Sequence, residues 1–141
     1  MTPDDARAED ALGWLGRARK DLRSAEALLA LEPPEVADCL FHLQQAVEKA
    51  AKAALTARDV PVRRTHDLVA LGRALGDVAP ELGARVAAAA PLGAQALLLR
   101  YPSQEEEPPA EEARAALTEV RELVEAVGGW LDDALGPSRG E

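Results

Sequence analysis

Apolar residues recur every three or four positions along most of the chain, which is the spacing of amphipathic helices. A first helix is expected from about Asp4 to Leu31, because Pro3 and the acidic residues after it suit a helix start. The consecutive prolines at positions 33 and 34 end it, since proline cannot continue a helix. Its expected buried face consists of Leu15, Ala18, Leu22, Ala25, Leu28 and Leu29.

A second helix is expected from about Glu35 to Arg58, followed by a loop at residues 59–64 that Pro61 interrupts. Its apolar stripe is continuous and comprises Val36, Cys39, Leu40, Leu43, Ala46, Val47, Ala50 and Ala54. Three polar residues with helical spacing, Gln45, Lys49 and Lys52, occupy a different face of the same helix.

A third helix is expected to begin with Thr65 as its N-cap, because a threonine hydroxyl can accept a hydrogen bond from a free backbone N–H of the first turn. Leu68 and Leu71 are its first buried residues, and it fades at residues 76–80. A fourth helix starts near Glu81, with a kink at Pro91 and Gly93, and ends before residues 101–103.

The last helix is expected at residues 110–135, after an acidic, proline-rich connector at residues 104–109. One of its faces carries Ala113, Leu117, Val120, Val124, Val127 and Leu131. No segment alternates apolar and polar residues over the length of a strand. The fold class is therefore all-α: an antiparallel bundle of about five helices with a four-helix-bundle-like core, in one domain at residues 1–135. Residues 136–141 are expected to be a disordered tail.

Composition supports a helical core, because 48% of the residues are hydrophobic but only 3% are aromatic, which leaves Ala, Leu and Val to fill it. The formal net charge of −9 argues against DNA binding by the molecule as a whole. A single cysteine, the absence of a signal peptide and the lack of a long apolar segment indicate a cytoplasmic protein that is not inserted in a membrane. We expect no metal and no cofactor, because the chain has neither a Cys/His cluster nor a glycine-rich phosphate loop.

Four motifs resemble the HEPN family, the "higher eukaryotes and prokaryotes nucleotide-binding" domains. The second helix reads Phe41-His-Leu-Gln-Gln-Ala-Val-Glu-Lys-Ala-Ala-Lys-Ala53, similar to the FHxQQAxEKxxKA-type signature helix of that family. Thr65-His-Asp-Leu68 and Arg100-Tyr-Pro102 follow it in the family's order. Trp14, with Ala18, Asp21-Leu22 and Ala25, is similar to the family's first helix.

The resemblance implies a helical bundle that forms homodimers and acts as the substrate-binding or complementing subunit of a separate minimal nucleotidyltransferase. Another branch of the family consists of metal-independent ribonucleases of toxin–antitoxin systems, which carry an Arg, four to six intervening residues and a His. This sequence departs from that pattern, because seven residues separate Arg58 from His66, while Arg63 and Arg64 lie too close to it. We therefore expect a binding protein more than an enzyme, with no catalytic residues assigned.

The segment from Lys49 to His66 is basic in an otherwise acidic chain. Lysine and arginine side chains can hold phosphate, so Gln45, Lys49, Lys52 and Arg64 are candidate nucleotide-binding residues. The alternative interpretation is a solvated helix face and a basic loop that complements an acidic partner.

Two helix ends complete the candidate site. Thr65 and His66 precede a helix whose free N–H groups could bind an anion, although capping alone explains Thr65. Arg100 and Tyr101 end an apolar helix, where the arginine needs a partner: a phosphate, a partner protein, or a carboxylate or carbonyl of the chain itself. For His42 a packing role is favoured over a catalytic one. Trp14 and Trp130 are interpreted as anchors of the bundle.

Three functions remain open at this stage. The favoured one is a HEPN-like nucleotide- or substrate-binding subunit that works with a separate nucleotidyltransferase, in a context like that of toxin–antitoxin systems. The second is a ribonuclease that uses His42 or His66 together with an arginine. The third is a dimeric adaptor without catalytic activity.

Overall fold

The structure is a computed structural model of the whole chain, and it describes residues 1–62, 64–98 and 107–136, without the side chains of residues 96–98. Two of the candidate residues, Arg100 and Tyr101, and the expected tail at residues 137–141 lie outside this part of the chain. Throughout the described residues the chain is helical or forms connections, with no strand. The all-α prediction is confirmed.

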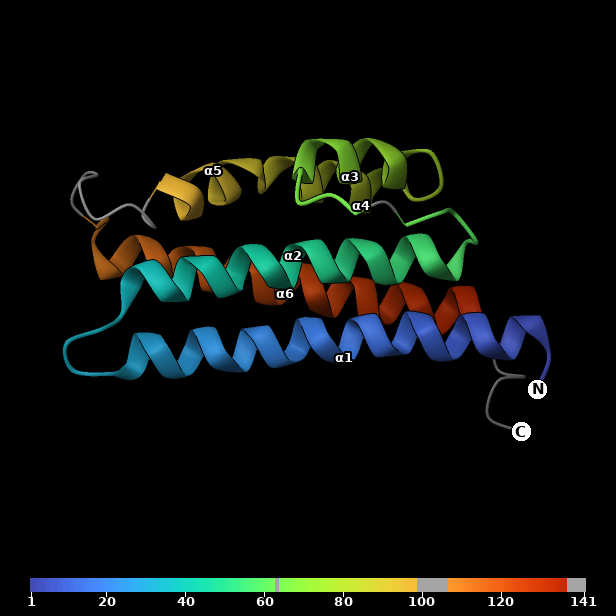
Figure 1. Cartoon of the computed structure of the whole chain (residues 1–141), viewed down its shortest axis with the longest axis horizontal. Coiled ribbons are helices and arrows are strands. Elements are labelled where there is room, and N and C mark those ends of the chain that lie inside the picture. The colour runs from blue at the N-terminus through green and yellow to red at the C-terminus, as the bar shows by residue number, and fades with distance from the viewer. Residues whose placement is uncertain (63, 99–106, 137–141) are drawn as a thin grey trace.

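Three long helices lie side by side and form the main body of the bundle: α1 (Pro3–Ala30), α2 (Val36–Ala57) and α6 (Ala110–Leu135) (Figure 1). α1 runs in the opposite direction to α2 and α6. Three shorter helices, α3 (Leu68–Gly76), α4 (Pro80–Ala88) and α5 (Ala90–Leu98), form a layer above α2 and α6. α2 packs against each of the other five helices, so the residues of its flanks face both layers.

The ends of the long helices follow local chemistry. Thr2 accepts a hydrogen bond from the backbone N–H of Asp5, and the Asp5 carboxylate accepts one from the N–H of Thr2, which makes a capping box. Hydrogen bonding to Thr2, first through its backbone N–H and then through its side chain, lowers the pKa of the Asp5 carboxyl, because it favours the ionised form. At the other end α1 stops at Ala30, just before Pro33, as the sequence predicts.

The predicted N-cap of the third helix is wrong. Asp67 is the N-cap of α3, because its Oδ1 accepts hydrogen bonds from the backbone N–H groups of both Val69 and Ala70. The Thr65 hydroxyl instead accepts a hydrogen bond from the N–H of Asp67, which orders the turn before the helix. A carboxylate at the N-cap also carries the charge that the positive end of the helix dipole favours.

The predicted fourth helix is two helices, α4 and α5, separated at Ala89. The sequence predicts a kink at Pro91 and Gly93, and the interruption falls slightly earlier. Pro91 has no N–H to donate to a carbonyl of the preceding turn, so it is tolerated only near the start of a new helix. It is the second residue of α5.

The core is built from Ala, Leu and Val, as the composition predicts. α2 presents a row of fully buried alanines, which allow close approach of the neighbouring helices: Ala46, Ala50, Ala51, Ala53 and Ala54. Trp14 and Trp130 are partly buried against this core, in agreement with their interpretation as anchors. Each ring also faces a cation, with Arg17 and Lys52 at Trp14 and Arg58 at Trp130.

α3 and α4 contact each other backbone to backbone through glycines. A Cβ atom added to Gly83 would lie 2.5 Å from the Gly76 nitrogen and 2.6 Å from the Gly72 carbonyl oxygen. A Cβ atom on Gly72 would lie 2.8 Å from the Gly83 carbonyl oxygen. No other residue fits in this contact, so the glycines hold the two short helices together and fix the layer that covers α2.

Candidate functional site

A buried carboxylate of α1, Asp21, joins two side chains of α2. His42 Nδ1 lies 2.8 Å from Asp21 Oδ1, and Lys49 Nζ lies 2.6 Å from Asp21 Oδ2. His42 and Lys49 are seven residues apart, two helical turns, and therefore share the face of α2 that meets α1. Each oxygen of the carboxylate thus has one partner, and the charge of Asp21 is balanced by that of Lys49.

A second buried carboxylate, Glu48, repeats this arrangement on α2. His66 Nδ1 lies 2.6 Å from Glu48 Oε1, and Lys52 Nζ lies 3.1 Å from Glu48 Oε2. Gln44 Nε2 also donates to Glu48 Oε1, at 3.4 Å. The Glu48 and Lys52 side chains are only 4% and 8% exposed, whereas that of His66 is 79% exposed. Glu48 therefore anchors a surface histidine to the interior of the bundle.

Among the described residues, every buried polar side-chain atom has a hydrogen-bond partner. Such satisfaction matters because an unpaired buried charge costs several kcal/mol, on the order of 3–5 for a broken pair. The Lys52 ammonium also lies 5.4 Å from the centre of the Trp14 ring. We conclude that polar contacts, as well as apolar packing, hold α1 and α2 together and connect α2 to the segment before α3.

A pocket of about 620 Å³ opens beside the Glu48 cluster, between α2, the start of α3 and α5. Its walls are mostly apolar, with Gln44, Gln45, His66 and Asp67 as the polar members. The remaining lining residues are Phe41, Leu68, Val69, Ala90, Gly93 and Ala94. An apolar cavity of this size with a few converging polar groups is the usual form of a small-molecule site.

The residues predicted as a nucleotide site divide between this pocket and the polar clusters. Gln45 and His66 line the pocket, whereas Thr65 does not. Lys49 and Lys52 are paired with carboxylates, and Arg64 is exposed. Their role in phosphate binding stays a prediction, but the solvated-face interpretation is wrong for Lys52, which is 6% exposed because it neutralises buried Glu48.

The start of α3 also differs from the predicted anion site. The N–H groups of Val69 and Ala70, which the sequence leaves available for an anion, both donate to the Asp67 carboxylate. A negative side chain therefore occupies the place where a phosphate was expected.

Comparison with models of known protein families identifies the family of the chain. The HEPN domain family model matches residues 11–130, which includes both polar clusters and the described pocket. The chain belongs to the HEPN family. Searches of curated proteins and of solved structures gave no match. Membership supports a nucleotide-binding or ribonuclease-like domain in general terms.

In this HEPN domain, the family's signature helix is α2, and its polar residues are explained by the two clusters. His42 and Lys49 bind Asp21, while Gln44 and Lys52 bind Glu48. His42 is half-buried and hydrogen-bonded, in agreement with its interpretation as a packing residue. The signature therefore describes how the bundle is held together as much as how it meets a ligand.

Asp21, Glu48 and Phe41 are the functional candidates that residue-by-residue reasoning missed. A signal existed for Asp21, because it lies between Ala18 and Ala25 on the buried stripe of its helix, where an acidic residue needs a partner. Glu48 gave a weaker signal, since a Glu four residues before a Lys is also common on solvated helix faces.

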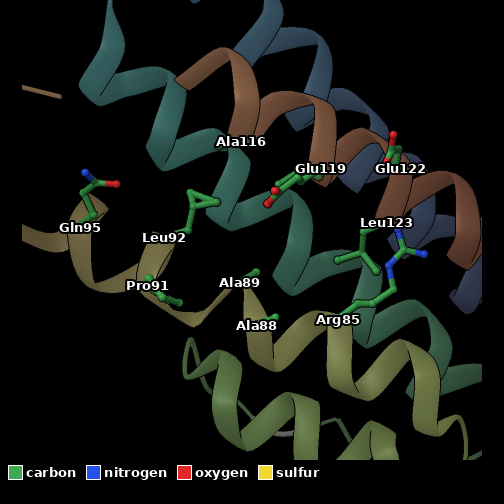
Figure 2. A pocket seen from close by; sticks show the side chains of 11 residues that line it. Arg85, Ala88, Ala89, Pro91, Leu92, Gln95, Ala116, Glu119, Glu122 and Leu123 are labelled. Carbon is green, nitrogen blue, oxygen red and sulfur yellow. The ribbon is translucent and has the colours of Figure 1, made fainter. Parts of the chain in front are cut away.

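A second cavity, of about 350 Å³, lies between α6 and the junction of α4 and α5. Figure 2 shows Glu119 and Leu123 of α6 and Arg85 and Leu92 of α4 and α5 around the same hollow. It contains none of the residues predicted from the HEPN motifs. A search of the described residues found neither a group of metal-binding side chains nor a helix long and apolar enough to span a membrane.

Proposed function

We propose that this HEPN domain is a nucleotide- or substrate-binding subunit that works with a separate minimal nucleotidyltransferase, in a context like that of toxin–antitoxin systems. In this proposal the pocket between α2, α3 and α5 receives the nucleobase. The observation that carries it is the combination, at one opening, of an apolar wall with Phe41 and a polar edge with Gln45 and His66.

The shape and chemistry of the pocket suit a base better than a phosphate. A flat aromatic ring can pack against Phe41 and Leu68, because the faces of a base are apolar and its edge is polar. The volume of about 620 Å³ falls in the range of small-ligand sites, roughly 300–1,000 Å³. Lys49 and Lys52, the two lysines of the helix that carries Gln44 and Gln45, are already paired with carboxylates.

A homodimer belongs to the same proposal. Its support is the outer face of α1, where Leu12 is 38% exposed and where a Cβ atom on Gly13 or Gly16 would meet nothing within 4 Å. Glycine inside a helix costs about 1 kcal/mol relative to alanine, so an open glycine is better explained by a neighbouring molecule than by packing within the chain. Sedimentation showing a stable monomer at micromolar concentration would contradict this part.

The test is calorimetric titration of the whole chain with a panel of nucleosides, monophosphates and triphosphates. We expect saturable binding by the wild type and a loss of about tenfold or more in affinity for Phe41→Ala, since stacking contributes about 1–3 kcal/mol per base. Arg85→Ala, in the cavity of Figure 2, is the matched control and should bind as the wild type does. Absence of saturable binding with every compound would refute the proposal.

A ribonuclease is the second candidate, because both histidines are held by carboxylates through Nδ1, an arrangement that leaves Nε2 for proton transfer. Metal-independent RNA cleavage that disappears in the His42→Ala/His66→Ala double variant would favour it. Cleavage that persists in the double variant would exclude this mechanism.

A further inference from the structure

Three polar residues at the edge of the pocket, Gln45, His66 and Asp67, can accept hydrogen bonds, and this bears on what the ligand offers. We infer that the pocket recognises a nucleobase through N–H donors on the base edge, as amino-bearing bases present, with His66 Nε2 as one acceptor and Glu48 as the residue that positions it. The inference rests on the proposed function and names the ligand class of that same pocket.

Glu48 fixes which nitrogen of His66 carries the proton. An ionised carboxylate only accepts hydrogen bonds, so the 2.6 Å contact from His66 Nδ1 to Glu48 Oε1 requires a hydrogen on Nδ1. Glu48 cannot turn away, because it is 3% exposed and its other oxygen holds the Lys52 ammonium at 3.1 Å. The histidine ring is therefore tied at Nδ1 to the interior and presents its opposite edge, with Nε2, to the exterior.

The tautomer decides what Nε2 can offer to a ligand. Lys52 already balances the charge of Glu48, so the cluster needs no positive charge from the imidazole. A neutral ring with its hydrogen on Nδ1 has a lone pair on Nε2. Since His66 lines the pocket and its side chain is 79% exposed, that lone pair is available to a ligand.

Two further pocket residues can also accept hydrogen bonds. Asp67 caps α3 with Oδ1 and keeps Oδ2 as an acceptor that carries negative charge. Gln45 Nε2 donates to Gln44 Oε1 at 2.8 Å, which uses one amide hydrogen within the protein and leaves the Gln45 carbonyl oxygen able to accept. Three acceptors beside an apolar wall fit the amino and ring N–H groups of a base, and the Asp67 carboxylate repels a phosphate.

The protonation of His66 is measured directly by nitrogen-15 NMR of the labelled chain, which distinguishes the two neutral tautomers. We expect the Nδ1–H tautomer for wild-type His66 at neutral pH. In Glu48→Gln the charge-assisted bond is lost, so the population should move toward the Nε2–H form. A wild-type ring in the Nε2–H form overturns the inference whether or not the variant folds.

Two nucleoside pairs test the ligand class by calorimetry. Guanosine against inosine, and adenosine against purine riboside, each differ by one exocyclic amino group. We expect the amino-bearing member of at least one pair to bind about five- to fiftyfold more tightly, as a hydrogen bond to a neutral or charged acceptor would give. Asp67→Asn keeps a good N-cap and removes the charge, so it should reduce this preference and improve triphosphate binding relative to nucleoside binding.

The calorimetric results distinguish failure of this inference from failure of the proposed function. Equal affinities within both pairs, or affinity that rises with each added phosphate in the wild type, overturn the inference and leave nucleotide binding established. No binding by any nucleoside or nucleotide overturns both.

Discussion

Asp21 and Glu48 are the residues on which most of the polar interior depends. Each is a carboxylate with one histidine and one lysine, and each connects segments that are distant in sequence. A complete buried ion pair adds little net stability, because the cost of taking both charges out of water offsets their attraction. Removal of one member is different, because it leaves its partner buried without compensation.

Asp21→Ala should therefore lower the free energy of unfolding by about 2–4 kcal/mol, since Lys49 and His42 lose their shared acceptor in a half-buried place. Urea unfolding followed by circular dichroism measures this difference. Glu26→Ala is the control on the same helix: Glu26 pairs with Arg121, but both side chains are more than 40% exposed, so the cost should be about 0–1 kcal/mol. Equal costs for the two variants would contradict our description of the Asp21 cluster.

How much of the site could be predicted depends on how far each residue lies in the sequence from the residue that it contacts. Gln45 and His66, which line the pocket, could be predicted as candidate binding residues, because each belongs to a motif that is local in the sequence. The pairing of Lys49 could not, since its acceptor is 28 residues away on another helix. A lysine at helical spacing looks the same whether it faces solvent or a buried carboxylate, and only the packing of α1 on α2 distinguishes the two cases.

At the scale of elements, the long helices were predictable because their apolar stripes are uninterrupted and prolines or glycines mark their ends. The predicted range of the last helix agrees with α6, and the predicted first helix differs from α1 by one residue at each end. The short helices were harder, since each has nine residues, about two and a half turns, and so gives few repeats of the pattern. Asp67, not Thr65, caps α3 because a carboxylate reaches two N–H groups of the first turn.

The glycine contact between α3 and α4 gives a prediction at this scale. Gly83→Ala should lower the free energy of unfolding by about 1–3 kcal/mol, because its Cβ would overlap backbone atoms of α3 that cannot move aside. Gly129→Ala is the matched control and should raise stability by up to about 1 kcal/mol, since α6 has open space there and alanine favours helix. Thermal unfolding of both variants measures the difference, and the same sign for both would refute this account.

At the scale of the whole molecule, stability should depend on pH through Cys39. Burial raises the pKa of its thiol from 9.0 to about 11. A folded-state pKa above the unfolded value means that this stability is complete below about pH 9 and is lost as the pH rises towards 11, because only the unfolded chain ionises in that window. Urea unfolding at pH 8 and pH 10.5 should show a larger loss for the wild type than for Cys39→Ala. The same loss in both proteins would assign it to other groups.

The position of α2 at the centre of the bundle has a consequence for how the chain folds. α1 and α2 are joined by residues 31–35 and make the most extensive contact of any two described helices, so the cost of closing the loop between them is small. α6 reaches the same helix only after a long stretch of chain. The α1–α2 hairpin should therefore form early, and substitutions within it should slow refolding, whereas substitutions in α6 should mainly accelerate unfolding. The helix that carries the family signature would then also organise the folding nucleus.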